Sequence, residues 1–252
     1  MVTLKYQERF KTVKGVFDAF TNRNLFELQS RGHFDELVSP LKIGKEANVF
    51  LASAEGGKHY VIVKIYRIQN SDFSGMYNYI KQDPRYVSLK KRRREIIFAW
   101  VQREYKNLHR SYEAKIDVPE PLVLKHNVLV EELIGDKISG EVALPLKDSV
   151  PEDPEEFLDL IIKQVRKMYH KANLVHGDLS AFNILNLQKT VKGELIETPI
   201  LIDFSQCTLV KSRASSELLQ RDMKNVLQFF KKHGVRRDLD TVLAKIVKKW
   251  IL

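Results

Sequence analysis

The chain has 252 residues, of which 44% are hydrophobic and 29% are charged. These values exclude a disordered, collagen-like or coiled-coil protein, and they suffice for one large domain or two small lobes. Lys and Arg outnumber Asp and Glu by 42 to 32, so the net charge is +10. This excess indicates either a polyanionic partner, such as nucleic acid, a membrane surface or nucleotide phosphates, or a basic face that is solvated by water alone.

Cys207 is the single cysteine. A disulfide framework and a cysteine-based zinc site are therefore excluded. The first fourteen residues contain no apolar core of a secretory signal, and the apolar runs are too short to span a bilayer. We therefore expect a cytoplasmic protein with no membrane partner.

The first half of the chain predicts a preface followed by strands. Thr21 is placed to cap a short helix that ends at Gly32, and Pro40 is expected to break the chain. Residues 48–52 and 59–66 are rich in β-branched and aromatic residues and predict two strands.

Residues 67–94 lack periodicity and predict a long flexible insertion, which ends in the basic run 90–94. A helix over 95–114 follows, because its apolar residues recur on one face. Short strands are expected at 122–124 and 127–132.

The second half is mainly helical. We expect an irregular linker over 135–154, a strongly amphipathic helix over 155–172 and strand-like runs at 184–187 and 200–203. Two final helices are predicted at 216–233 and 238–250. This order predicts a two-lobed α+β protein. The expected units are a preface over 1–40, an N-lobe with an antiparallel sheet and one main helix over 41–134, and a mainly helical C-lobe over 135–252.

The most informative segment runs from Leu174 to Leu185 and has the form H-x-D-x-x-x-x-N. In phosphoryl transfer, an Asp in the first position can take or orient the proton of an attacking hydroxyl group, and the Asn can bind a magnesium ion. In this sequence the two residues are Asp178 and Asn183. Alone, His176 would be an ordinary hydrogen-bonded loop histidine.

Three further residues complete the pattern. Asp203 follows an apolar strand, where a carboxylate suits a divalent cation that bridges phosphates. Lys64 ends an earlier apolar strand and can contact phosphates, and Glu104 on the predicted helix can pair with it. Each residue alone has an ordinary structural explanation, as a turn former or a solvated charge. In this order, together, they predict a nucleotide-dependent phosphotransferase.

The sequence resembles the RIO family of atypical serine/threonine protein kinases, most closely its archaeal-type branch without an N-terminal winged helix. The resemblance covers residues 18–234. Four segments carry it: Gly44-Lys45-Glu46-Ala47-Asn48-Val49-Phe50, His176-Gly177-Asp178-Leu179-Ser180, Asp203-Phe204-Ser205-Gln206 and Arg221-Asp222-Met223-Lys224-Asn225-Val226.

Departures from ordinary protein kinases fit this resemblance. Of a glycine-rich G-x-G-x-x-G loop only Gly44 remains. The arginine that reads activation-loop phosphorylation in ordinary kinases is replaced by Gly177, and the glycine of D-F-G by Ser205. No A-P-E motif follows Asp203, so the resemblance implies a trimmed kinase fold without a platform for peptide substrates.

The resemblance also implies a role for each site residue. Asp178 is expected to be the catalytic base, with Asn183 and Asp203 as magnesium ligands and Lys64 as the phosphate-binding lysine. Glu104 is its expected partner. The 44–49 loop, through Gly44, Lys45, Glu46 and Val49, is expected to cover the phosphates. Backbone groups of Glu132 and Ile134 are expected to bind adenine, and Glu131 stands where the family more often has an apolar residue.

The implied function is an ATP- and Mg²⁺-dependent kinase, with Mn²⁺ as an alternative ion, that acts in maturation of the small ribosomal subunit. Family members can phosphorylate themselves, and several work mainly as ATPases through a phosphorylated aspartate, here Asp203. A pre-small-subunit ribosomal particle is the expected partner. Its rRNA would contact the 90–94 run and the basic C-terminal residues Lys231, Lys232, Arg236, Arg237, Lys245, Lys248 and Lys249.

Two other functions stay open. A small-molecule kinase of the aminoglycoside or choline phosphotransferase type would also carry His176-Gly177-Asp178-Leu179 with Asn183. An RNA-binding scaffold without turnover would explain the basic segments, because lysine and arginine contacts to phosphates give sequence-independent affinity. Retention of the lysine, the base and the metal ligands argues against this scaffold.

Overall fold

The computed structural model describes residues 17–68, 73–81 and 83–248. The N-terminal part of the predicted preface, including the segment examined for a secretory signal, lies outside the described residues, and so do Lys249 and the predicted helix end at Trp250. Across the described ranges, no helix combines the length and the apolar character needed to cross a membrane.

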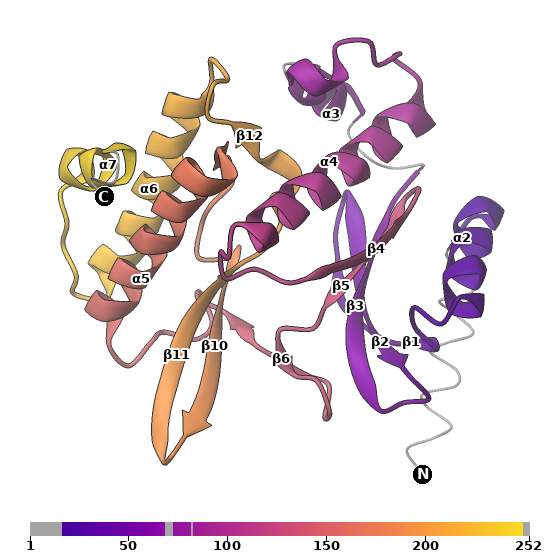
Figure 1. Cartoon of the computed structure of the whole chain (residues 1–252), viewed down its shortest axis with the longest axis horizontal. Helices are drawn as coiled ribbons and strands as arrows, with labels where there is room; N and C mark the ends of the chain where they lie inside the picture. The colour runs from indigo at the N-terminus through magenta and orange to yellow at the C-terminus, as the bar shows by residue number, and fades with distance from the viewer. Residues whose placement is uncertain (1–16, 69–72, 82, 249–252) are drawn as a thin grey trace.

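A five-stranded antiparallel sheet forms one side of the molecule (Figure 1). The spatial order of its strands is β1-β2-β3-β5-β4. The strands are β1 (Glu36–Ile43), β2 (Ala47–Ala54), β3 (His59–Tyr66), β4 (Pro121–Lys125) and β5 (Val128–Glu132). The central strand β3 is buried from Val61 to Tyr66, which explains why these residues, apart from Lys64, are β-branched or aromatic.

Helix α2 (Ala19–Ser30), which precedes the sheet, and the edge strand β1 each correct one prediction. Its cap is Asp18, whose carboxylate accepts a hydrogen bond from the Thr21 amide at 2.9 Å, whereas Thr21 itself is buried inside the helix. Pro40 does not break the chain but lies within β1, between two register shifts. A proline is tolerated there because β1 is an edge strand, where one row of amide groups has no partner strand.

The described part of the segment between β3 and the main helix, which leaves out residues 69–72 and 82, is not the structureless loop that the sequence predicts. It contains α3 (Phe73–Ile80) and the 3₁₀ turn η1 (Pro84–Tyr86). Met76 and Ile80, four residues apart, are buried against helix α4 (Arg93–Glu113). Helix α4 itself lies between the two sides of the molecule, as Figure 1 shows. It packs against α3 and β4 on one side and against the 3₁₀ turn η3 (Phe204–Gln206) on the other.

Helices form most of the other side. They are α5 (Pro154–Lys167), the π-helical turn η2 (Met168–Ala172), α6 (Ser215–Lys232) and α7 (Leu239–Val247). Their apolar faces share one core, which includes Phe157, Ile161, Met223 and Phe230. We call elements α2 to β5 the sheet lobe and elements from β8 (Leu144–Pro145) to α7 the helical lobe.

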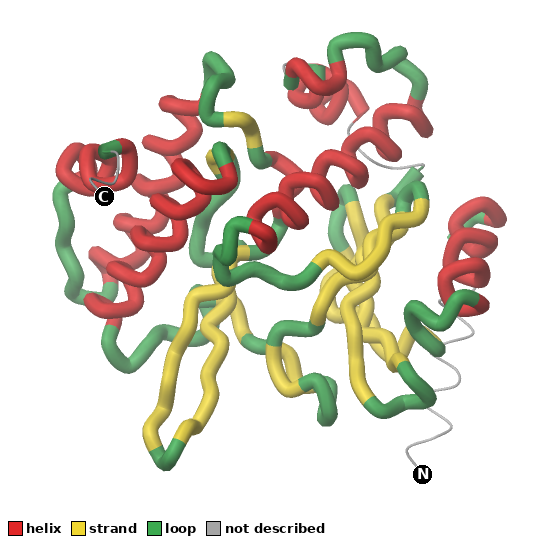
Figure 2. Tube along the Cα trace, viewed as in Figure 1, coloured by secondary structure: helices red, strands yellow, loops and turns green. Residues whose placement is uncertain are grey.

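The predicted linker over 135–154 contains short strands instead of irregular chain. β6 (Gly135–Asp136) pairs with β7 (Glu141–Val142), and β8 pairs with β10 (Ile184–Val191). β10 and β11 (Glu194–Leu201) form a long hairpin that projects from the helical lobe in Figure 2. Two further strands, β9 (Leu174–Val175) and β12 (Thr208–Leu209), pair on either side of the 176–207 region. These pairings fix the segments that flank Asp178 and Asp203.

Candidate active site

A cavity of about 840 Å³ lies between the two lobes. Predicted site residues that line it are Gly44, Lys45, Glu46, Val49, Lys64, Glu132, Ile134, Asn183 and Asp203. Glu104 and Asp178 lie beside these residues, because Glu104 contacts Lys64 and Asp178 contacts Asn183. The fold therefore brings the predicted site residues together from segments far apart in the sequence.

The turn between β1 and β2 covers one end of the cavity. Gly44 is required there, since a Cβ atom at this position would lie 2.7 Å from the carbonyl oxygen of Ala47. The Gly44 amide donates to that same oxygen at 3.0 Å. This tight turn places Lys45, Glu46 and Val49 along the cavity.

Lys64 is the cation at the centre of the site. Its Nζ lies 2.7 Å from Glu104 Oε1 and 3.5 Å from Asp203 Oδ1. Burial alone would lower the pKa of Lys64, but Asp203 and Glu104 outweigh burial and raise the pKa well above its ordinary value. Lys64 therefore stays protonated at any physiological pH.

Asp203 follows β11 in a left-handed backbone conformation, with φ of 65°. Its Oδ1 accepts a hydrogen bond from the Ser205 hydroxyl at 2.7 Å. Burial would raise the pKa of Asp203, but the Lys64 ammonium and the Ser205 hydrogen bond lower it to about 2. A non-glycine residue with this backbone stores strain of about 1–3 kcal/mol, which the surrounding structure must hold.

Asp178 and Asn183 face each other in the loop between β9 and β10. The Asn183 amide nitrogen donates to the backbone oxygen of Asp178 at 2.8 Å and to its Oδ2 at 3.2 Å. Burial and the nearby Asp203 raise the pKa of Asp178 above its ordinary value. The two donated bonds turn the Asn183 amide oxygen away from Asp178.

The backbone of this loop is held by helix α6. Asp222 accepts hydrogen bonds from the amides of Gly177, at 2.7 Å, and Leu179, at 2.9 Å. Gly177 has a φ of 80°, and a Cβ atom there would lie 2.7 Å from the backbone oxygen of Gln206. The glycine at position 177 therefore allows the loop between β9 and β10 to lie directly against the turn that follows Asp203.

His176 is a neutral structural residue. It is 3% exposed, and its Nε2 lies 3.0 Å from the carbonyl oxygen of Ile202, to which it can only donate. Burial lowers the pKa of His176 to about 4. His176 thus tethers the chain just before Asp203.

Glu131 is a carboxylate at the inner wall of the cavity. It stands opposite Ile62 in the sheet register. Burial raises the pKa of Glu131 to about 7, although Lys64 acts in the opposite direction. A carboxyl group that holds its proton near neutral pH can donate as well as accept hydrogen bonds.

The donor set fits a magnesium nucleotide. Within the described residues, no group of three or more His, Cys, Asp and Glu side chains is arranged to hold a metal ion. Mg²⁺ typically takes only one or two protein ligands together with phosphates and water, so Asp203 and Asn183 suffice. Glu104 Oε2 is buried without a hydrogen-bond partner, beside the ammonium group that would face the phosphates.

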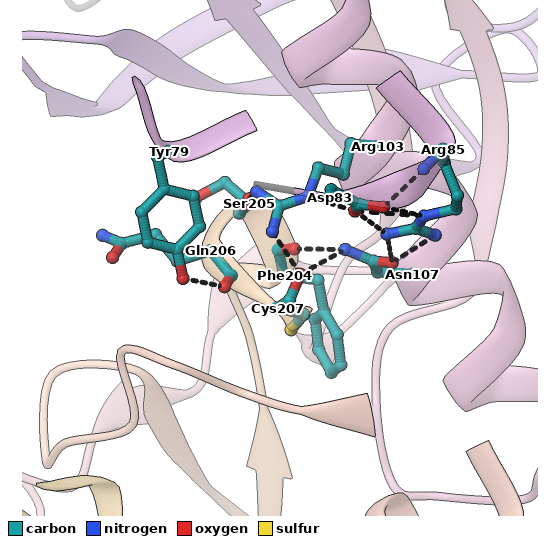
Figure 3. Close-up of polar contacts among 9 residues, drawn as sticks. All are labelled: Tyr79, Asp83, Arg85, Arg103, Asn107, Phe204, Ser205, Gln206 and Cys207. Atoms are coloured by element: carbon teal, nitrogen blue, oxygen red, sulfur yellow. Dashed lines mark hydrogen bonds and ion pairs between the residues drawn. The ribbon is translucent and has the colours of Figure 1, made fainter. Parts of the chain in front are cut away.

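Sequence reasoning missed the residues that hold the turn after Asp203. Arg103 and Asn107 of α4 donate hydrogen bonds to backbone oxygens of this turn, as Figure 3 shows. A signal was present, because polar residues at 103 and 107 share a helix face with the apolar residues Trp100 and Leu108. Polar side chains on the buried face of a helix need specific partners.

Comparisons with known proteins agree with this geometry. Residues 48–242 match the RIO domain. The chain is 37% identical to the RIO-type serine/threonine-protein kinase Rio1 of Haloferax volcanii, covering 95% of this chain and 78% of that protein. It is 39% identical to Rio1 of Methanocaldococcus jannaschii, over 92% of this chain and 75% of that protein.

Solved structures confirm the two-lobed kinase-like fold predicted from the sequence. The Rio2 kinase–ADP/Mg²⁺–phosphoaspartate complex from Chaetomium thermophilum superposes with a TM-score of 0.65 at 23% identity, covering 90% of this chain and 66% of that one. The small-molecule kinase and the scaffold without turnover are not favoured by these matches. The RIO domain matches residues 48–242, and the archaeal kinases match nearly the whole chain. This protein therefore belongs to the RIO family of atypical serine/threonine protein kinases.

Proposed function

We propose that this kinase binds ATP and a divalent ion, Mg²⁺ or Mn²⁺, in the cavity between its lobes and transfers the γ-phosphoryl group to a protein hydroxyl, to water or to itself. The observation that carries the proposal is the convergence of Lys64, Asp178, Asn183 and Asp203 on one cavity. A cavity of about 840 Å³ suits a nucleotide, since small-molecule pockets are typically about 300–1,000 Å³.

Each residue has a distinct part in this proposal. The Lys64 ammonium, fixed by Glu104, neutralises phosphate charge. Asp178 accepts the proton of the attacking hydroxyl group or water, which its raised pKa favours. Asp203, ionised because of its low pKa, and the amide oxygen of Asn183 would hold the metal ion, which would supply positive charge to the phosphates.

We propose that the adenine lies against the C-terminal end of β5. The Ile134 carbonyl accepts a hydrogen bond from the Ala143 amide at 2.8 Å, so the Ile134 amide is the candidate donor to the base. Val49, Ile62 and Leu185 supply apolar surface on its two faces. We expect the Glu132 carbonyl to accept from the adenine amino group.

ATP turnover tests this assignment. Asp178→Asn and Asp203→Asn should each lower kcat at least about 100-fold, which is the lower range of general-base and positioning effects. Asp178→Asn should still bind the Mg²⁺ nucleotide, whereas Asp203→Asn should lose the Mg²⁺ dependence of binding. Asp148→Asn, at the exposed rim of the same cavity, is the matched control. Unchanged turnover in both site variants would refute the proposal.

We further propose that turnover governs association with a pre-small-subunit ribosomal particle. The support is the net charge of +10 together with the exposed basic positions Arg92, Arg93 and Arg94 at the start of α4. Lysine and arginine contacts to RNA phosphates give an affinity that falls steeply with salt.

Retention on particles tests this role. Asp178→Asn and Asp203→Asn should stay bound to purified pre-small-subunit particles after ATP is added, whereas the unsubstituted chain should be released. If both variants are released at the same rate as the unsubstituted chain, turnover does not govern association. Binding that is independent of salt would separately count against contacts to rRNA phosphates.

A further inference from the structure

The turn that follows Asp203 is held from outside by side chains. Its four consecutive backbone oxygens, from Phe204 to Cys207, each accept a hydrogen bond from a side chain of α3 or α4. Arg103 donates to Ser205 at 2.9 Å and to Cys207 at 2.6 Å, and Asn107 donates to Phe204 and Cys207 at 3.2 Å. The Tyr79 hydroxyl donates to Gln206 at 2.5 Å. Figure 3 shows Tyr79 beside Gln206 on one side of the turn, and Arg103 and Asn107 on the other.

Arg103 is the centre of this arrangement, and it depends on the insertion. Its side chain is 1% exposed, and its Nε lies 3.1 Å from Asp83 Oδ2. Asp83 is itself held by Arg85, whose Nη2 lies 2.6 Å from the same oxygen. Arg85 also donates to Asn107 Oδ1 at 3.1 Å. One network of hydrogen bonds thus joins Tyr79, Asp83 and Arg85 to helix α4 and the turn 204–207.

This network sits where the backbone is strained. Asp203 has a φ of 65°, a conformation that a non-glycine residue keeps only when its surroundings impose it. The turn is bound through its carbonyl groups, and a hydrogen bond to a carbonyl oxygen favours one direction of that group. A buried ion pair adds little net stability compared with apolar residues of the same volume, so Arg103 and Asp83 are not explained by stability alone.

We propose that Arg103 is a positioning residue for phosphoryl transfer: anchored by Asp83, it holds the turn 204–207 and so aims the Asp203 carboxylate at the metal ion. The inference rests on the proposed function of Asp203 as a metal ligand. It predicts that loosening the network weakens metal binding more than nucleotide binding. Tyr79, Asp83 and Arg85 of the insertion, which do not line the cavity, thereby act on the active site from outside it.

Arg103→Lys is the main test. Lysine keeps the buried positive charge but cannot reach Asp83, Ser205 and Cys207 with one planar group. The Mg²⁺ concentration for half-maximal turnover should rise about 10- to 100-fold, as for other residues that orient metal ligands. The affinity for a fluorescent ATP analogue without Mg²⁺ should change less than twofold.

A second readout needs neither metal nor turnover. In the nucleotide-free variant, peptides that cover residues 203–210 should exchange their amide hydrogens at least about tenfold faster, while peptides from β3 should not change. Asp83→Asn should act in the same direction as Arg103→Lys. Tyr79→Phe, which removes only the contact with Gln206 and is the variant most certain to fold, should give a smaller shift in the same direction.

Two controls separate positioning from general destabilisation. Arg110→Lys changes an exposed arginine of the same helix and should leave every readout unchanged. Leu28→Ala removes a buried side chain from a core away from the turn and should lower Tm while leaving the Mg²⁺ requirement alone. If Arg103→Lys likewise lowers only Tm, Arg103 serves stability and the inference is wrong.

Asp203→Asn distinguishes this inference from the proposed function. If Asp203→Asn abolishes the Mg²⁺ dependence of nucleotide binding and Arg103→Lys does not alter it, only the inference fails. If Asp203→Asn itself binds the Mg²⁺ nucleotide as the unsubstituted chain does, Asp203 is not the metal ligand and both fail.

Discussion

Lys64 illustrates how single residues in the site depend on one another. Glu104, its partner at 2.7 Å, is 1% exposed, so neither charge can turn to water if the other is removed. Asp203 adds a second carboxylate at 3.5 Å. The lysine therefore neutralises two acidic groups that the fold has already brought together.

Lys64→Met should lower the free energy of unfolding by about 3–5 kcal/mol at pH 8, because it leaves a buried carboxylate without its counterion. Protonation of Glu104 relieves this cost, so the loss should be smaller at pH 5. Chemical denaturation at pH 8 and at pH 5 measures the loss of unfolding free energy at each pH. Lys58→Met, at an exposed turn, is the control, and an equal loss at both pH values would contradict the explanation.

Glu131 predicts a pH dependence of stability. Its folded pKa of about 7 lies above the ordinary value of 4.5, so the folded chain holds a proton that the unfolded chain has released. Its contribution to stability is therefore present below about pH 4.5 and is lost as the pH rises to about 7. Glu131→Gln should match the unsubstituted chain in Tm at pH 4 and exceed it at pH 8. Glu141→Gln, at an exposed position, should show no such pH-dependent difference in Tm from the unsubstituted chain.

Among the elements, helix α6 contributes side chains to the core and also holds the loop that contains Asp178. Through Asp222 it fixes the amides of Gly177 and Leu179, which flank Asp178. Asp222 is 1% exposed, and a helix is a rigid support for such an anchor.

Asp222→Asn should lower kcat about 100-fold while KM for ATP changes less than twofold, because one amide oxygen cannot hold both backbone groups and Asp178 shifts. Steady-state kinetics separate the two constants. Glu217→Gln on the exposed face of α6 should leave both unchanged. A rise in KM with an unaltered kcat would place Asp222 in nucleotide binding instead.

The elements also show what a sequence can and cannot predict. Strand β3 was predictable from its run of β-branched and aromatic residues, and helix α4 from apolar residues that recur on one face. Helix α3 was not, since it has only eight residues, includes Gly75 and becomes helical by burying Met76 and Ile80 against α4. Tertiary structure also explains why Pro40 lies within a strand, because β1 is at the edge of the sheet and an edge strand tolerates proline.

The site was predictable where the residues that carry its chemistry stand at a fixed spacing in the sequence. Asp178 and Asn183 are five residues apart in one loop, so the motif alone indicated both. Arg103 lies 102 residues from Ser205, its partner in the turn, and only the packing of α4 against η3 reveals that contact. Support of a site by distant side chains therefore leaves little trace in one sequence.

At the scale of the whole molecule, the two lobes have separate hydrophobic cores. Residues on both sides line the cavity, among them Val49 and Lys64 of the sheet lobe and Asn183 and Asp203 of the helical lobe. A ligand that bridges them therefore joins two cores into one unit.

A non-hydrolysable ATP analogue with Mg²⁺, at about 100 times its Kd, should stabilise the protein by about 2.7 kcal/mol and raise Tm by about 5–10 °C. Scanning calorimetry should show one transition with the ligand bound. The same analogue with EDTA should give a smaller rise. An equal rise without the metal would show that the ion does not join the lobes.

Gly177 limits how such an enzyme can be controlled. A side chain there would meet the backbone of Gln206 at 2.7 Å and the Tyr79 hydroxyl at 3.0 Å, so the catalytic loop and the turn after Asp203 would have to separate. Ordinary kinases carry an arginine at this position as their receiver for a regulatory phosphate. An arginine at position 177 would therefore force these two segments apart, so that kind of phosphate receiver is incompatible with the site as it is built here.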